Sequence, residues 1–510
     1  MHLNARLRML CALSSVVLAG LAFGHSVRAA SSGAAMPAMP PVAPAVAAIV
    51  AASPREKALQ TLKAITPGVI QRRFDQEVRW QHESLLKAYE AVGSRDPKWD
   101  DIVRQSLTLA ARVFAQDPTR PGDAVERLRE LFGKAVAAGC DDPLIAYFNA
   151  RYADPFRREG EAAAELVRAA TKLEQSRYPV FRRAQALTAA ADGLAEAARK
   201  TVLPSAAVDF AERGKLLDRA TALLPEVLKD VTITDRQIRL ITTSIVKGRQ
   251  RLGGDRLQAY ETLAPMLAGG LSGDRAAAVQ PVIKADVLNE AAWDIRGTGY
   301  SETVSDEKFR RFGELMRQAE SSLIEGIDKG SSDPGVASDM MRLLVGLGVA
   351  DERDKEMTEW FELARRLESG SVDPYDRRLT SLLPRWGGTD RAVLAFGRAA
   401  FARKEWGSRA PFTLVAAHDW IHRGPPSKLG YFERKEVCAE VKSVYETFLA
   451  QHPDAAIDRS RYVRRLVECK SWRDADAQMK RLGNRVVASV FDGQYEVERK
   501  LIDTFLNASR

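Results

Sequence analysis

The stretch FGELMRQAESSL at residues 312–323 carries an apolar side chain at almost every third or fourth position. Apolar residues with this spacing lie on one face of an α-helix, and that face packs against a core. Similar stripes occur within residues 216–227, 357–367 and 437–448. Strand-like runs are confined to residues 231–234 and 486–490, and they do not recur at a spacing that would build a sheet. The sequence therefore predicts an all-α protein.

Asp-Pro pairs predict where many of these helices begin. Aspartate accepts hydrogen bonds from the N–H groups of a first turn, and proline fits the first helical position. Thr234 followed by Gln237 predicts a capping box at a further helix. Short links between helices favour antiparallel hairpins. The pairs are Asp96-Pro97, Asp117-Pro118, Asp142-Pro143, Asp154-Pro155, Asp333-Pro334 and Asp373-Pro374.

One C-terminal hairpin is similar to a tetratricopeptide unit. Its first helix is expected over residues 431–451, its turn at residues 452–454, and its second helix ends near Cys469. Trp472 and Ala475 then have the aromatic-x-x-Ala spacing of that repeat. No regular repeat period is found elsewhere, so we expect antiparallel helical hairpins stacked as a degenerate tetratricopeptide-like α-solenoid.

The N-terminus has the features of an export signal. Arg6 and Arg8 precede an apolar run, and Val27 with Ala29 forms a small-residue cleavage site, which predicts a signal peptide at residues 1–29. Residues 30–53 are rich in Ala and Pro and are expected to be a disordered tether. We divide the remainder into an N-terminal helical-hairpin region, residues 54–260, and a C-terminal tetratricopeptide-like region, residues 261–510. No later run is long and apolar enough to cross a bilayer, so we expect a periplasmic or secreted protein without a membrane span after cleavage.

The charge balance is mildly basic. The net charge of +9 becomes +6 once the leader and its three arginines are removed. Export and the mixing of arginines with acids argue against a nucleic-acid partner. The densest basic cluster is Arg459, Arg461, Arg464 and Arg465, which we interpret as a solvated helix face, with phosphate or anionic glycan binding as the alternative.

Three cysteines remain in the mature chain. Cys438 and Cys469 lie at similar distances on either side of the turn at residues 452–454, so an antiparallel hairpin would place them level. A disulfide between them is therefore possible in an oxidising compartment. Cys140 is the odd cysteine, which we interpret as a small buried apolar residue in preference to a reactive thiol.

Motifs for catalysis or cofactor binding are not found in the sequence. His418 and His422 have the spacing of two metal ligands on a helix, but no third ligand can be named, so no metal is predicted. There is no nucleophile elbow, phosphate loop or dinucleotide fingerprint. We therefore predict no catalytic residue and no cofactor.

Two segments stand out from the helical pattern, AWDIRG at residues 292–297 and PRWGG at residues 384–388. Their Trp-x-x-Arg-Gly and Pro-x-Trp-Gly-Gly patterns resemble an uncharacterised bacterial domain-of-unknown-function family with tetratricopeptide-like helices. The resemblance covers residues 263–401 and implies a fold without an activity. We expect these segments either to lock a corner between helices or to form the floor of a groove in which arginine grips a carboxylate or phosphate. The residues concerned are Trp293, Arg296, Gly297, Trp386, Gly387 and Gly388.

The sequence favours an exported helical scaffold or protein-interaction module that binds a protein or peptide partner in the cell envelope. The alternative is a helical-toroid enzyme that acts on a polysaccharide. An open array of helices would favour the scaffold, whereas a closed ring with acids and aromatic residues gathered at one end would favour the enzyme.

Overall fold

A computed structural model describes residues 53–152, 159–200, 206–297, 299, 303–347, 350–424, 428–491 and 494–508. The signal peptide predicted at residues 1–29, nearly all of the tether at residues 30–53, and the pair Asp154-Pro155 lie outside these residues. The described part of the chain contains helices and connecting turns but no strand, which confirms the all-α prediction. Within the same part, no helix has the length and apolar character needed to cross a bilayer.

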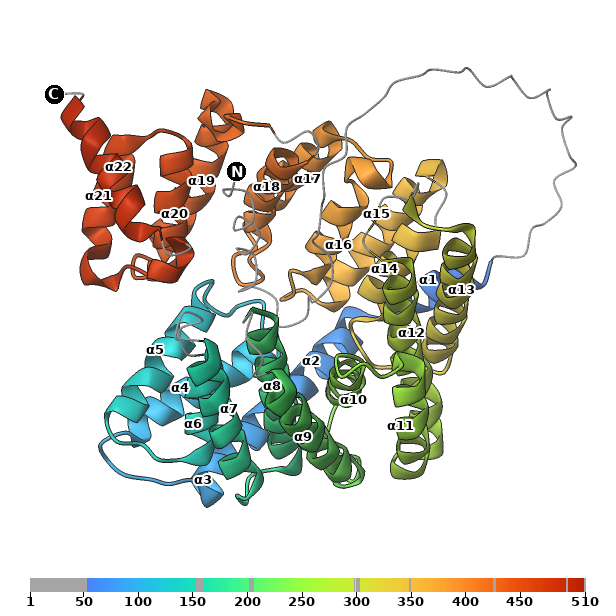
Figure 1. Cartoon of the computed structure of the whole chain (residues 1–510). Coiled ribbons are helices and arrows are strands. Elements are labelled where there is room, and N and C mark those ends of the chain that lie inside the picture. The colour runs from blue at the N-terminus through green and yellow to red at the C-terminus, as the bar shows by residue number, and fades with distance from the viewer. Residues whose placement is uncertain are drawn as a thin grey trace, which may run out of the picture.

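The first of three core clusters joins the N-terminal helices (Figure 1). It also includes Val279 and Val287 of the following helix, α12, so this core extends past residue 260. Its helices are α2 (Pro67–His82), the π-helix η1 (Glu83–Lys87), α3 (Ala88–Val92), α4 (Asp100–Phe114), α5 (Ala124–Ala137), α6 (Pro143–Tyr152), α7 (Glu159–Glu174), α8 (Val180–Lys200), α9 (Ala206–Val227), α10 (Asp235–Gln250) and α11 (Arg256–Gly270).

The second core cluster lies in the middle of the chain and includes the stripe at residues 312–323. Leu315, Met316 and Leu323 of this stripe are fully buried, because all three lie on one face of α13. The helices of this cluster are α1 (Pro54–Lys63), α12 (Gly273–Arg296), α13 (Asp306–Asp328), α14 (Val336–Leu347), α15 (Ala350–Leu367) and α16 (Asp373–Ser381).

The third core cluster contains the C-terminal hairpins, among them the one predicted around residues 452–454. Ala475 is fully buried here, and Trp472 stacks on Phe505 with ring centroids 4.4 Å apart. The helices are η3 (Pro384–Trp386), α17 (Asp390–Ala402), η4 (Ala410–Phe412), α18 (Thr413–Arg423), η5 (Tyr431–Glu433), α19 (Lys435–Gln451), α20 (Ala456–Glu468), α21 (Trp472–Leu482), η6 (Gly483–Arg485), η7 (Ala488–Phe491) and α22 (Tyr495–Ala508).

Consecutive helices pair as hairpins, and the even-numbered helices form a second set of contacts. From α8 to α18, each even-numbered helix also packs against the next even-numbered one. Among the odd-numbered helices of this part, only α9 and α11 make a comparable contact. Helices approach one another more closely on the inner side of a curved array, so the even-numbered helices form the inner layer of the arc in Figure 1.

The arc closes on itself. The connection between α4 and α5 meets the C-terminal hairpins, and Figure 1 shows α19 and α20 directly above α5. Arg409 donates from Nη1 to the carbonyl oxygen of Gly122 at 2.9 Å. The backbone N–H of Ile457 donates to Oε1 of Glu126 at 3.0 Å, across 331 positions of sequence. The hairpins therefore form the predicted solenoid-like array, and its curvature brings the C-terminal hairpins against the α4–α5 connection, which closes the array into a ring.

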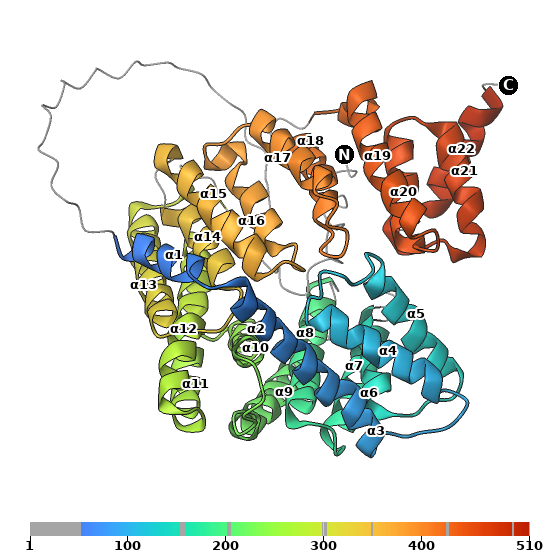
Figure 2. The ribbon, with the colours of Figure 1, turned by 180° about the vertical axis from the view of Figure 1, so that it is seen from behind.

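The first two helices cross the back of the ring (Figure 2). α1 packs against α13 and α15, and Nη1 of Arg55 lies 3.0 Å from Oε2 of Glu356. α2 reaches α10, where the side chain of Gln237 donates to Oε1 of Glu77 at 2.7 Å, and α8, where Arg182 donates to Gln81 at 2.5 Å. These contacts join the first core cluster to the second.

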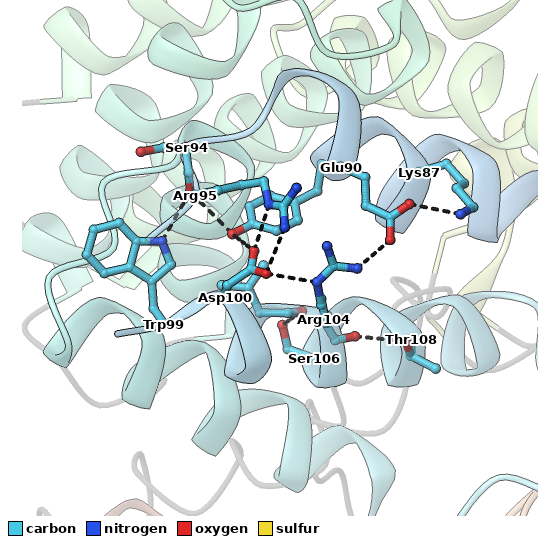
Figure 3. A network of polar contacts seen from close by, with 11 residues as sticks. Lys87, Glu90, Ser94, Arg95, Trp99, Asp100, Arg104, Ser106 and Thr108 are labelled. Atoms are coloured by element: carbon cyan, nitrogen blue, oxygen red, sulfur yellow. Dashed lines mark hydrogen bonds and ion pairs between the residues drawn. The ribbon is translucent and has the colours of Figure 1, made fainter. Parts of the chain in front are cut away.

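A network of charged side chains fastens α3 to α4 (Figure 3). Asp100 accepts from Nε of Arg95 at 3.1 Å and from Nε of Arg104 at 2.9 Å, and Arg104 also pairs with Glu90. The hydrogen bond from Arg95 is the largest contribution that holds the pKa of Asp100 well below its ordinary value. Nε1 of Trp99 donates to the Ser94 carbonyl at 3.1 Å, which fixes the turn between the two helices.

The predicted helix starts are only partly correct. Asp142 caps α6 by accepting from the N–H of Leu144 at 2.9 Å, and Thr234 caps α10 by accepting from the N–H of Gln237. The side chain of Gln237 bonds to Glu77 instead of completing a capping box. At Asp96, Asp117 and Asp333 the Asp-Pro pair lies in a turn, and the next helix begins three or more residues later. At Asp373 the helix α16 begins at the aspartate itself.

Candidate functional site

The structure brings Trp293, Arg296 and Trp386 together although they are far apart in sequence. The rings of Trp293 and Trp386 meet edge to face with centroids 5.6 Å apart. The guanidinium carbon of Arg296 lies 5.5 Å from the Trp293 ring centroid and 5.4 Å from that of Trp386. Trp293 also packs on Phe312 of α13, so this corner joins α12, α13 and η3.

The glycines of the corner meet backbone requirements. Gly387 is left-handed with φ of 84°, and Gly297 ends α12 with φ of 72°. A Cβ atom on Gly388 would lie 2.0 Å from the carbonyl oxygen of Leu382. Residues with side chains rarely adopt the positive φ angles of Gly387 and Gly297, and the packing at Gly388 leaves no room for a Cβ atom. The glycines therefore allow the chain to turn tightly beneath Trp386.

The donors of Arg296 are directed at the backbone. Its Nη1 donates to the carbonyls of Gly297 and Gly299, both at 3.2 Å, and burial lowers the pKa of its guanidinium. Within the described ranges, no carboxylate lies at ion-pair distance from Arg296. The Trp293 and Trp386 rings pack on the guanidinium, and backbone carbonyls accept its hydrogen bonds. This geometry fits a packed corner better than an anion-binding site.

A pocket of about 410 Å³ lies next to the corner, and sequence reasoning did not predict it. Gly387 and Gly388 form one wall, α16 supplies Arg378, and α17 supplies Phe396. Arg378 is 8% exposed, and its Nη2 donates to Oδ1 of Asp354 at 2.8 Å and to Thr358 at 3.0 Å. Nothing local marks Arg378 in the sequence, because its burial depends on packing between α15, α16 and α17.

A second unpredicted feature is a group of charged residues on the inner layer. The central cluster consists of Arg120, Arg236, Glu368, Asp373, Asp376 and Arg377. Arg236 of α10 lies within electrostatic range of Glu368, which follows α15, and of Arg120 in the α4–α5 connection. Arg120 donates from Nη2 to the Gly370 carbonyl at 2.8 Å. Closure of the ring thus brings three distant parts of the chain to one place.

The carboxylic acids of the central cluster have raised pKa values. Burial, together with the neighbouring Asp373, raises the pKa of Glu368 to about 8. The same two causes raise the pKa of Asp376 to about 7. The hydroxyl of Ser338 lies 2.5 Å from Oε1 of Glu368 and favours its charged form, but burial outweighs it. Near neutral pH these groups can therefore hold or release a proton.

The two histidines with metal-ligand spacing have other partners. His418 is 1% exposed, and its Nδ1 lies 2.9 Å from the Tyr431 hydroxyl while its Nε2 lies 2.9 Å from Oε2 of Glu440. Burial lowers the pKa of His418. Nδ1 of His422 lies 3.3 Å from the Lys428 carbonyl. A pocket of about 200 Å³ adjoins this group, but both ring nitrogens of His418 already have partners within the protein. The described residues contain no group of three side chains placed to hold a metal ion.

The cysteine pair lies where the hairpin register places it. Cys438 and Cys469 are free, and the two thiols lie close enough to interact. Burial and this contact raise the pKa of the Cys469 thiol. Cys140 is buried, and burial raises its pKa to about 11, so it carries little thiolate at neutral pH.

The four arginines of α20 do not form a solvated face. Arg459 is buried and donates to the Pro453 carbonyl at 2.7 Å. Arg461 pairs with Asp458, Arg464 donates to the Val490 carbonyl at 2.6 Å, and Arg465 pairs with Asp419 at 2.6 Å. These side chains hold α20 to its neighbours, so neither the solvated-face interpretation nor an open phosphate site describes them.

No family model and no curated protein matches this sequence. The resemblance of residues 263–401 to a domain-of-unknown-function family therefore stays a prediction.

Proposed function

We propose that this chain is an exported helical scaffold that holds a protein or peptide partner of the cell envelope against the central cluster. One observation carries the proposal. Arg236, Asp373, Asp376 and Arg377 are half-buried, yet their side chains make no hydrogen bond or ion pair with any described residue. Half-buried charges without partners are costly in a folded protein. A bound segment with complementary groups would relieve that cost.

The unpaired charged groups come from more than one helix of the inner layer. They lie on α10 and α16, which are separated by two other helices of the inner layer. Curved helical arrays typically bind extended segments along the inner layer, where several helices contribute contacts at once. Both signs of charge are present, so we expect the partner segment to carry both acidic and basic side chains.

Site-specific photo-crosslinking tests this proposal in the host of the protein. A photoreactive residue replaces Arg236 or Asp376 in the central cluster, and the matched control replaces Arg310, which is exposed on the outer helix α13. We expect one envelope protein to crosslink from both inner positions and not from the outer one. Equal crosslinking from all three positions, or none from the inner two, would contradict the proposal.

The helical-toroid enzyme remains a second candidate because two observations favour it. The ring is closed, and Glu368 has a raised pKa beside Asp373, an arrangement typical of an acid paired with a carboxylate. Sugar rings usually stack on accessible aromatic side chains, however, and the strongly exposed aromatics of the described chain are Phe210, Trp420 and Phe505, on α9, α18 and α22. Polysaccharide turnover that is lost in Glu368→Gln would establish the enzyme, and no turnover by the unmodified protein would leave the scaffold.

A further inference from the structure

The pocket beside Gly387 and Gly388 combines one buried charge with an apolar wall. Its volume of about 410 Å³ lies within the range of small-molecule sites. Leu382, Ala392, Ala395 and Phe396 form the apolar part, and Ser381 and Thr389 contribute hydroxyl groups. The side chain of Arg378 supplies the positive charge, and it is 10% exposed.

Arg378 is held in place by its own neighbours. Besides Thr358, the hydroxyl of Ser381 lies 3.4 Å from its Nη1, and Ser381 in turn donates to the Arg378 carbonyl at 2.8 Å. These contacts fix the plane of the guanidinium. A fixed guanidinium is suited to recognition of a carboxylate, because two parallel N–H groups match the two oxygens.

The only carboxylate paired with Arg378 among the described residues is that of Asp354. The side chain of Asp354 is 66% exposed, and it belongs to the first half of α15, whereas Arg378 lies on α16. A solvent-exposed side chain gains little from one ion pair and leaves it easily. Asp354 therefore occupies the place that the carboxylate of a ligand would take.

The glycine wall explains why the space exists. Gly387 is left-handed and Gly388 packs against the Leu382 carbonyl, so this wall of the pocket is formed by backbone. Thr389, which also lines the pocket, caps the N-terminus of α17, and the dipole of that helix favours a negative group nearby. The pattern Pro-x-Trp-Gly-Gly thus shapes both the corner and the pocket.

We propose that this pocket binds a small monocarboxylic acid with an apolar body, its carboxylate on Arg378 and its body on Leu382 and Phe396. Such a group occurs both in free short-chain acids and at the C-terminus of a peptide that ends in an apolar residue. The binding of this acid is independent of the partner proposed for the central cluster, since none of the six cluster residues lines the pocket.

Calorimetric titration of residues 30–510 with hexanoate and with N-acetyl-leucine tests the inference and separates the two sources. Hexanamide and N-acetyl-leucinamide have the same shape without the charge. We expect at least one acid to bind and neither amide to do so. Binding of hexanoate alone identifies a free acid as the ligand, and binding of N-acetyl-leucine alone identifies a peptide C-terminus.

Two variants make the test specific. Asp354→Asn removes the competing carboxylate and should tighten binding by about tenfold, whereas Arg378→Gln should weaken it by at least about tenfold. Asp454→Asn is the matched control, because Asp454 pairs with Arg485 on the surface and is 81% exposed. Unchanged affinity in Asp354→Asn, or amides that bind as well as acids, would overturn the proposal. Because Asp354→Asn is a gain of affinity, a folding defect in Arg378→Gln cannot imitate it.

Discussion

At the scale of single residues, the inner layer contains both paired and unpaired charges. Nε of Arg239 lies 2.8 Å from Oδ2 of Asp333, and Arg239 also pairs with Asp339, so these carboxylates raise the pKa of the arginine despite its burial. Among the described residues, the carboxyl group of Glu368 has a hydrogen-bond partner only in the Ser338 hydroxyl. A buried acid with a single neutral donor is more stable protonated than ionised.

The first prediction concerns how stability depends on pH. The folded-state pKa of Glu368 is about 8, above its ordinary value of 4.5, so the folded protein binds more protons than the unfolded chain between these limits. The contribution of Glu368 to the free energy of unfolding should then be greatest below pH 4.5 and should fall as the pH rises towards 8. Glu368→Gln should remove on the order of 2 kcal/mol of that fall. Urea unfolding at pH 5 and pH 8 measures it.

Glu362 provides the control for this measurement. It lies on α15, pairs with Arg365 at 2.8 Å, and is 46% exposed. Glu362→Gln should leave the difference in stability between pH 5 and pH 8 unchanged. If Glu368→Gln also leaves it unchanged, Glu368 is ionised in the folded protein and the raised pKa is wrong.

At the scale of helices, most of the fold could be predicted because the signal is local. The stripe at residues 312–323 and the cap at Thr234 depend on side chains within one or two turns. The helix start predicted at Asp117-Pro118 is wrong because the conformation of this pair depends on residues that are distant in sequence. The Pro118 carbonyl packs against Gly407, so the segment turns there and α5 begins only at Ala124. The residues near Pro118 in sequence do not predict this contact with Gly407.

The candidate sites also differ in whether local sequence could predict them. The corner could be found because Trp, Arg and paired Gly interrupt a helical pattern. Arg378 and Glu368 could not, since arginine and glutamate are abundant in this chain and only packing distinguishes these two from exposed ones. The arginines of α20 were misinterpreted for the converse reason, because their partners Asp419 and Val490 lie on other elements.

The second prediction tests the corner. Arg296→Ala removes stacking on two tryptophan rings and two hydrogen bonds to carbonyls, so it should lower the free energy of unfolding by about 1–2 kcal/mol. The loss should stay below the roughly 3–5 kcal/mol of a broken buried ion pair, since Arg296 pairs with no described carboxylate. Denaturant unfolding measures it, with the exposed Arg310→Ala as control. An unchanged stability would indicate that Arg296 does not lock the corner.

The third prediction concerns the hairpin of α19 and α20. The Cys438 and Cys469 thiols lie close enough to interact, so oxidation should join them in the exported form proposed for this chain. The bond should raise the free energy of unfolding by about 3 kcal/mol relative to the Cys438→Ser variant. Non-reducing peptide mass mapping of exported material reports the bond directly. Two free thiols in that material would show that the pair stays reduced.

At the scale of the whole molecule, closure of the ring depends on places where a backbone meets a backbone. A Cβ atom on Gly407 would lie 2.0 Å from the Pro118 carbonyl oxygen, and one on Gly370 would lie 1.6 Å from that of Gln116. Backbone atoms cannot move aside as the end of a side chain can. The α4–α5 connection therefore fits against the C-terminal half only where glycine is present.

The last prediction follows from this fit. Gly407→Ala should displace the α4–α5 connection and separate Gly122 from Arg409, because no rearrangement of side chains can relieve a contact with a carbonyl oxygen. The helices on each side have their own cores, so helicity by circular dichroism should be retained while the radius of gyration in X-ray scattering increases. Gly214→Ala, where a Cβ atom meets nothing within 4 Å, should change neither quantity. An unchanged radius of gyration in Gly407→Ala would mean that hydrogen bonds such as those of Arg409 and Ile457 hold the ring closed without this backbone fit.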